Sequence, residues 1–376
     1  MTTTPNDPQH SLTLDVLRAV AALMVFAYHC HTELFPHSSS PLLPTITLGS
    51  TGVILFYVLS GLVIAGSLVR GAKIESGTAA LRSFWIKRFF RIYPLYIFSC
   101  LAVLVLNDQI RNSLTTENLL YHIFGLHCLI RDYHGAINGV LWTLSLEIQF
   151  YLLAPLCFLI INKIGAGRFL TLIILLWTIC YGLIRFYLIE TLNFWGGASG
   201  PDFWSYFIGL NQIPSCLMFF ALGMYAYYKP IRFKSLLIPI LSVASVLVLP
   251  YIPFSAILPE KYFDAYAINY FRQGLYGLCF YIWVLYAYGI TRMPGLFTKL
   301  MIWIGGLSYS FYIWHLLILR IIAPNFPTMG PWLKLTIALI ATLILSDFTA
   351  RHIERLGISL GKHFLRRLPK SPKSER

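Results

Sequence analysis

Long apolar runs separated by short polar stretches make up most of the chain. A membrane-spanning helix needs roughly 20 apolar residues. The segment 117–130, ENLLYHIFGLHCLI, is too short and too polar to cross, so we interpret it as a re-entrant or interfacial helix. The pattern predicts an all-α polytopic membrane protein with ten transmembrane helices, at 12–32, 48–69, 85–106, 139–161, 169–188, 211–228, 235–250, 269–290, 300–322 and 332–350.

Composition and charge support this interpretation. The 376 residues are 57% hydrophobic and 12% charged, whereas soluble domains are about 25% charged. If the N-terminus lies inside, 21 Lys and Arg residues fall on the inward side and only Arg111, Arg131 and Lys261 on the outward side. The positive-inside rule then predicts that both termini are cytoplasmic. The same distribution explains the net charge of +14 without nucleic acid as a partner.

The remaining composition adds two expectations. The seven cysteines are scattered through apolar runs without a CxxC pair, so neither a metal site nor a disulfide framework is expected. The first apolar run lacks a small-residue cleavage site and should stay attached as the first span. We expect one transmembrane domain over 1–350, followed by a basic cytoplasmic tail over 351–376.

The first predicted helix, LDVLRAVAALMVFAYHC, carries Arg18 and His29 in an apolar run. Their spacing of eleven residues places them within about 20° of one direction, with a rise of roughly 16 Å. Asp15 lies on the same side. Ionisable residues inside a membrane are costly and are usually functional, so His29 is a candidate general base. The alternative is an interfacial Asp15–Arg18 ion pair with His29 as a structural polar residue.

Three further places carry candidate chemistry. Glu147 lies inside the fourth predicted span, near Trp142, and is expected to approach His29; the alternative is a hydrogen-bond anchor between helices. Arg88 and Arg91 share a helix face at the cytoplasmic entrance of the third span. Two guanidinium groups so placed can bind phosphate oxygens, although a purely topogenic basic cluster is the alternative. His315, in LSYSFYIWH, is expected to face the cavity of His29 or to pack near headgroups.

These segments together resemble the membrane acyltransferase-3 family, which transfers acyl groups to extracytoplasmic carbohydrates and other acceptors. The similar segments are LDVLRAVAALMVFAYH, FYVLSGLVI, KRFFRIYPLY, LWTLSLEIQFYLLAP and LSYSFYIWH, and they occur in the family's order from residue 14 to residue 315. The resemblance implies catalytic roles for His29 and Glu147, and acyl-CoA binding by Arg18, Arg88 and Arg91. Asp15, Trp142, Tyr309 and His315 are further candidates for lining the cavity.

The resemblance implies an O-acyltransferase, and most simply an O-acetyltransferase, in the cytoplasmic or inner membrane of a bacterium. Acetyl-CoA or another acyl-CoA would be a co-substrate, with no bound cofactor, and the partners would be membrane lipids and a glycan or lipid-linked sugar such as the O-antigen of lipopolysaccharide. Peptidoglycan or a small secreted metabolite are alternative acceptors. Outward segments such as 193–207 and 250–267 could line a sugar site or form an aromatic belt.

A transporter or flippase is the alternative class. It is disfavoured by the inward Arg88–Arg91 pair and by the absence of a clear two-fold internal repeat.

Overall fold

The computed structural model describes residues 12–36, 42–75, 77–231, 233, 235–253, 265–290 and 295–368. These ranges are almost entirely helical and contain no strand; the only β-type pairing in them is an isolated bridge between Gly197 and Gly200. Most of the predicted outward segment 250–267, the four basic residues Arg232, Lys234, Lys261 and Arg292, and the end of the predicted tail lie outside the described residues.

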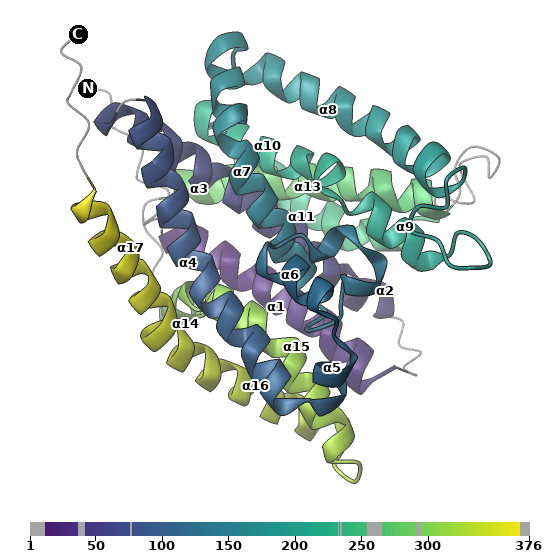
Figure 1. The fold of residues 1–376 in the computed structure, drawn as a ribbon. Helices are drawn as coiled ribbons and strands as arrows, with labels where there is room; N and C mark the ends of the chain where they lie inside the picture. The colour runs from purple at the N-terminus through teal and green to yellow at the C-terminus, as the bar shows by residue number, and fades with distance from the viewer. Residues whose placement is uncertain are drawn as a thin grey trace.

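The first half of the chain builds four of the long helices around the site (Figure 1). Each forms from one of the predicted apolar runs, and short helices connect them on one side of the molecule. The elements are α1 (Leu12–Leu34), α2 (Leu43–Thr47), η2 (Leu48–Thr51), α3 (Gly52–Ile74), α4 (Gly77–Leu106), α5 (Asp108–Ser113), α6 (Thr116–Ile123), η3 (His127–Leu129), η4 (Arg131–Tyr133) and α7 (Leu141–Ile164).

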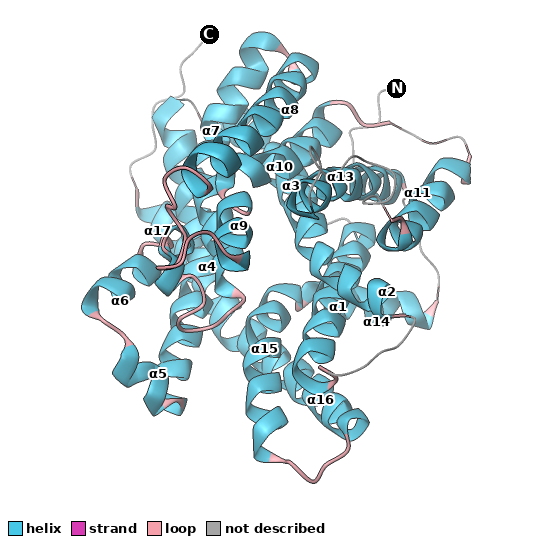
Figure 2. Ribbon diagram, turned by 90° about the vertical axis from the view of Figure 1, so that its right-hand side faces the viewer, coloured by secondary structure: helices cyan, strands magenta, loops and turns pink. Residues whose placement is uncertain are grey.

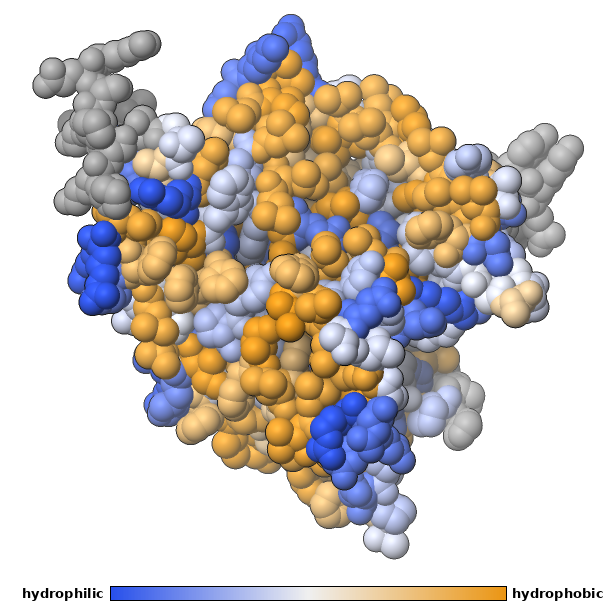
Figure 3. All heavy atoms as spheres, in the orientation of Figure 1, coloured by the Kyte–Doolittle hydropathy of each residue, from blue (hydrophilic) through white to orange (hydrophobic). Residues whose placement is uncertain are grey.

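The second half packs against these helices and closes the bundle (Figure 2). The elements are α8 (Ala166–Gly182), η5 (Leu183–Ile189), α9 (Phe203–Leu210), α10 (Ile213–Tyr228), α11 (Leu237–Val248), η6 (Leu249–Tyr251), α13 (Ala265–Gly289), α14 (Leu296–Gly306), α15 (Ser308–Asn325), α16 (Pro331–Thr349), η7 (Ala350–Glu354) and α17 (Arg355–Arg367). Apolar side chains cover much of the face shown in Figure 3, while polar residues lie along its upper and left edges and in patches near its centre and lower right. This surface suits a helical bundle surrounded by lipid.

The all-helical prediction is confirmed, but the count of ten spans is not. Among the described residues, six helices are long and apolar enough to cross a membrane, or up to eight if each of two bent pairs counts as one span. The predicted ninth span, 300–322, is broken at Leu307, where α14 and α15 meet at 76°. Two glycines end α14, and glycine is a poor helix former.

Close helix packing at glycines, expected from the glycine-rich second span, is present in the structure. Helices α3 and α10 approach so closely that a Cβ on Gly61 would lie 2.0 Å from the Phe220 carbonyl oxygen. Likewise, a Cβ on Gly223 would lie 1.9 Å from the Val58 carbonyl oxygen. Only a residue without a side chain allows this backbone contact. The contact fixes α3, one wall of the cavity described below.

Two segments differ in form from a simple membrane span. Residues 117–130 fold into α6 and the short η3 and pack against α7, where Ser145 donates to the Gly125 carbonyl and Gln149 donates to the sulfur of Cys128 at 3.2 Å. At the other end, α16, η7 and α17 form one helical run over 331–367. The predicted domain boundary at residue 350 therefore falls within a continuous helix, and α17 lies along α4 (Figure 1).

Candidate active site

A large cavity of about 1220 Å³ lies between α1, α3, α4, α7, α14, α15 and α17. Six of the nine residues selected from the sequence line it: Asp15, Arg18, Arg88, Arg91, Glu147 and Tyr309. They come from four helices that are far apart in the sequence. His29, Trp142 and His315 do not line this cavity.

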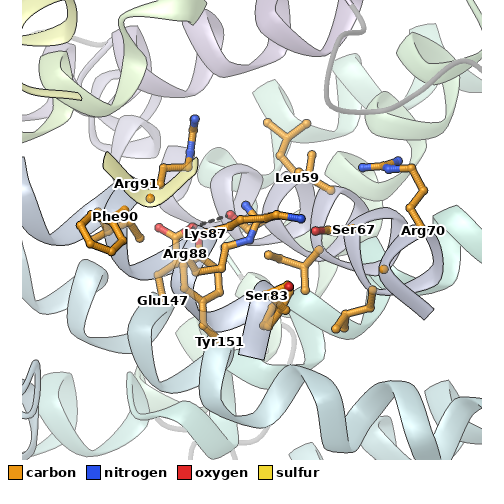
Figure 4. Close-up of a pocket in the computed structure, with 18 of the residues that line it drawn as sticks. Leu59, Ser67, Arg70, Ser83, Lys87, Arg88, Phe90, Arg91, Glu147 and Tyr151 are labelled. Carbon is orange, nitrogen blue, oxygen red and sulfur yellow. Dashed lines mark hydrogen bonds between the residues drawn. The ribbon is translucent and has the colours of Figure 1, made fainter. Parts of the chain in front are cut away.

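The cavity is rich in basic side chains. Six Lys or Arg residues line it against three carboxylates, and the six are Arg18, Arg70, Lys87, Arg88, Arg91 and Lys362. The Arg88–Arg91 pair comes from α4 and Arg70 from α3 (Figure 4). Lys362 comes from α17. An excess of positive charge in a concave site attracts anionic ligands.

Arg88 is the most enclosed of these basic groups. Its side chain is 8% exposed, and its Nε has no hydrogen-bond partner among the described residues. The guanidinium carbon lies 5.6 Å from the centre of the Phe84 ring and 5.7 Å from that of Tyr151. The Glu147 carboxylate acts electrostatically on this guanidinium, but a buried polar group without a hydrogen-bond partner is costly, so the Nε is suited to donate to a further anion. Arg91, one turn later, is exposed.

Glu147 is held within a small hydrogen-bond network between α3 and α7. Its Oε1 accepts from the Tyr151 hydroxyl at 2.5 Å and from the Ser60 hydroxyl at 2.9 Å. Tyr151 follows Glu147 by four residues, so both side chains lie on one face of α7. No contact with His29 is among the interactions of Glu147 in the described part of the chain. The expected approach of Glu147 to His29 is therefore not seen.

Arg18 and Asp15 form an ion pair within the first turns of α1. The two side chains are 19% and 22% exposed, so the pair faces the cavity and not the lipid. Helix α14 comes close here, because a Cβ on Gly305 would lie 1.9 Å from the Asp15 carbonyl oxygen. Tyr309, just after the α14–α15 break, donates to the Ile92 carbonyl at 2.7 Å and ties α15 to α4.

His29 and His315 form a hydrogen-bonded pair beyond the end of the cavity. His29 Nδ1 lies 2.9 Å from His315 Nε2. Tyr312 connects this pair to the cavity, since its side chain lines the cavity and its ring centre lies 5.5 Å from that of His315. Phe56, also a lining residue, packs edge-on against Tyr312 with 5.8 Å between ring centres. The Phe56–Tyr312 pair thus stands at the end of the cavity nearest His315.

Trp142 belongs to a different aromatic cluster. Its ring stacks on His134, with 5.4 Å between centres, and packs edge-on against Phe207. His134 lies in the connection before α7, and burial lowers its pKa to about 4, so it is neutral at physiological pH. Trp142 therefore supports the connecting segments and not the cavity.

The structure adds three hydroxyl groups that were not selected from the sequence: Ser60, Tyr151 and Tyr312. All three lie inside quoted motifs, FYVLSGLVI, LWTLSLEIQFYLLAP and LSYSFYIWH. The spacing of four residues between Glu147 and Tyr151 could have predicted their contact from the sequence. The hydrogen bond between Ser60 and Glu147 could not be predicted in this way, because it joins residues 87 positions apart. Within the described residues, no three His, Cys, Asp or Glu side chains form a metal-binding group.

Comparison with known proteins agrees with the helical cavity and its motifs. The acyltransferase domain family model matches residues 12–351. The chain belongs to the acyltransferase-3 family. This match covers nearly the whole described bundle and includes all nine residues selected from the sequence.

Several characterised or named relatives are similar over shorter stretches. Nodulation protein 10 of Rhizobium leguminosarum is 28% identical over 229 residues, which is 54% of this chain and 59% of the relative. Acyltransferase MdmB of Streptomyces mycarofaciens is 31% identical over 169 residues, 42% and 41% of the two chains. Peptidoglycan O-acetyltransferase OatA of Listeria monocytogenes is 24% identical over 374 residues, 91% of this chain and 55% of the relative.

The chain thus spans about 41% to 59% of the length of these relatives. No solved structure matches the chain significantly.

Proposed function

We propose that this chain is a membrane O-acyltransferase that moves an acyl group, most simply acetyl, from cytoplasmic acyl-CoA to a hydroxyl of an extracytoplasmic or lipid-linked glycan. The observation that carries the proposal is the buried guanidinium of Arg88, whose Nε has no hydrogen-bond partner among the described residues, in a basic cavity of an acyltransferase-3 chain. Acyl-CoA supplies both the phosphates that this cavity would bind and the thioester that the chemistry needs.

The donor would enter at the basic end of the cavity. Phosphates would bind Arg88 and Arg91, with Arg70 and Lys362 adding positive charge from the facing helices. The start of α1 and helix α17 line the same cavity, which agrees with two cytoplasmic ends of the chain. The pantetheine arm would then extend past Arg18 and Glu147 toward Tyr312.

His29 would act as the general base that deprotonates the acceptor hydroxyl. The Phe56–Tyr312 pair lies at the end of the cavity, and His315 lies next to Tyr312. The side chains of Phe56 and Tyr312 must therefore rotate away for the thioester to reach His29. Glu147, bound to Ser60 and Tyr151, would hold α3 and α7 around the arm of the donor.

The names of relatives favour a glycan acceptor, because one of them is a peptidoglycan O-acetyltransferase. A surface or lipid-linked glycan in a bacterial cytoplasmic or inner membrane fits this direction of transfer. The proposed acceptor site would lie on the side of His29 away from the cavity, where α1 ends at Leu34.

The test combines cells and purified protein. Mass spectrometry of envelope glycans from deletion cells, complemented cells and cells carrying His29→Ala should show acyl groups only with the wild-type chain. Purified protein in liposomes, given radiolabelled acetyl-CoA and the isolated glycan, should transfer label to the glycan. Unchanged glycan acylation in the deletion cells, together with no transfer in liposomes, would refute the proposal.

A further inference from the structure

We infer that His315 is a positioning residue that fixes the tautomer of His29, so that His29 presents a bare Nε2 to the acceptor. This inference rests on the proposed role of His29 as the general base. It assigns the orienting function to a histidine on α15, whereas the sequence pointed to Glu147.

The hydrogen bonds of His315 determine which of its nitrogens carries hydrogen. Its Nδ1 lies 2.7 Å from the Tyr312 carbonyl oxygen and 3.3 Å from that of Phe311. A carbonyl oxygen only accepts, so Nδ1 must be the N–H group. The ring is 1% exposed and packs between Phe26, Phe311 and Tyr312. No carboxylate contacts it among the described residues, so burial favours the neutral ring.

The tautomer of His29 follows from that of its neighbour. In neutral His315 with hydrogen on Nδ1, the Nε2 atom has a lone pair and can only accept. His29 Nδ1, 2.9 Å away, must therefore carry hydrogen and donate to it. The neutral ring of His29 then has its lone pair on Nε2, as a general base requires. A hydrogen bond to one ring nitrogen thus sets the reactivity of the other.

The hydrogen bond between His29 and His315 is kept during the transfer step. The acceptor oxygen forms a bond to the thioester carbonyl carbon while its proton passes to His29 Nε2. The carbon–sulfur bond then breaks, and the proton on Nε2 passes to the leaving thiolate. Throughout, the Nδ1–H of His29 donates to His315, and this bond strengthens while His29 carries positive charge. His315 cannot pass the proton on, because its other nitrogen already donates to a carbonyl.

One charged pair also faces this site. Arg320, five residues beyond His315 on α15, acts electrostatically on His29. Its Nε lies 3.2 Å from a carboxylate oxygen of Glu33 on α1. The Glu33 carboxylate offsets part of this positive charge. The ring of His29 also has a backbone hydrogen bond at Val25, one turn earlier on α1. Among the described residues, His315 is the only side chain seen to hydrogen-bond a ring nitrogen of His29, so a side-chain substitution at His315 tests its share of the orienting role.

The experiment compares His315→Gln with His315→Met in the purified, full-length protein. The glutamine oxygen can accept from His29 Nδ1, whereas methionine of similar size offers only a weak acceptor. We expect His315→Met to lower kcat for acyl transfer by about 10²-fold or more, and His315→Gln to stay within about 10-fold of wild type. The donor KM and the thermal unfolding temperature should match wild type in both.

Equal kcat values for the two variants would overturn the inference. Equal kcat values would leave the proposed function standing as long as wild type transfers acyl groups and His29→Ala does not. Absence of transfer by wild type would refute the proposed function itself. A second measurement reads the wild-type ring and does not depend on how the His315 variants fold. In ¹⁵N-histidine NMR of the wild-type protein, the signals lost in His29→Asn should report hydrogen on Nδ1 and none on Nε2. The reverse assignment would also overturn it.

Discussion

Replacement of Arg88 by methionine should raise the donor KM much more than the same change at Arg91. Methionine keeps the apolar contact with Phe84 and Tyr151 but removes the charge. The guanidinium of Arg88 is 8% exposed and has a free Nε, so a phosphate bound there forms charge-assisted hydrogen bonds worth about 1.5–3 kcal/mol. That range corresponds to a rise in KM of about 10- to 150-fold.

Arg91 is exposed, so solvent screens its interaction with a phosphate. Exposed ion pairs contribute about 0–1 kcal/mol, which corresponds to an effect on KM of at most about fivefold. Arg88→Lys should recover part of the loss, because an ammonium keeps the charge without the planar fork. Arg82→Met is the matched control, since Arg82 lies on the same helix but does not line the cavity.

The assay measures initial rates of transfer over a range of acetyl-CoA concentrations, and repeats them with acetyl-pantetheine, a donor without phosphates. The effect of Arg88→Met should vanish with acetyl-pantetheine, because that donor offers the guanidinium no anion. An equal loss with both donors would mean that Arg88 supports the fold and not the phosphate. Equal KM values for the Arg88 and Arg91 variants would refute the argument from burial.

Further predictions follow from individual contacts. His29→Ala should insert normally but lose transfer by about 10²–10⁴-fold, with Glu147→Gln between it and wild type; near wild-type rates for His29→Ala would exclude direct base catalysis. Gly223→Ala should destabilise the protein by about 1–3 kcal/mol in thermal unfolding, whereas Gly167→Ala, where the added Cβ meets nothing within 4 Å, should not. Asp202→Asn should lower the unfolding temperature at neutral pH, and its difference from wild type should shrink as the pH falls below the ordinary value of 3.8. Hydrogen bonds from an arginine hold the pKa of this carboxyl well below that value, so its stabilisation is present above 3.8 and is lost as the pH falls through the lowered pKa. Labels on both termini should report the cytoplasm, and an outward C-terminus would contradict the predicted topology.

The partner of Asp202 shows how the connections that are predicted to face outward are held together. Arg131 donates to both carboxylate oxygens of Asp202, at 2.8 and 2.6 Å, and Asp202 also caps the start of α9. Arg131 further donates to the Trp195 carbonyl at 2.8 Å, so the 193–207 segment is fixed against the segment before α7. Phe194, Phe203 and Trp204 remain exposed on it, which leaves both a sugar site and an interfacial belt open for these aromatic groups.

The sequence by itself determined the helical class, the membrane environment, the family motifs and most of the candidate residues. Each of the ten predicted apolar runs overlaps a helix, because hydrophobic length and helical periodicity are local properties. The spacing of Arg88 and Arg91 by one helical turn predicted that both lie on one side of their helix, and both line the cavity. Such patterns need no knowledge of which helices become neighbours.

Only the tertiary structure decided how these residues combine. The His29–His315 bond joins positions 286 residues apart, and the Glu147–Ser60 bond joins positions 87 apart. Packing between distant helices also decides three other features. These are the helix break at Leu307, the continuation of α16 into α17, and the position of Trp142 outside the cavity. Long-range contacts are set by the shapes of facing helix surfaces, which one sequence does not encode in any local period. The proposed base His29 and the candidate His315 were both visible in the chain, but their direct hydrogen bond appears only where α1 and α15 come together.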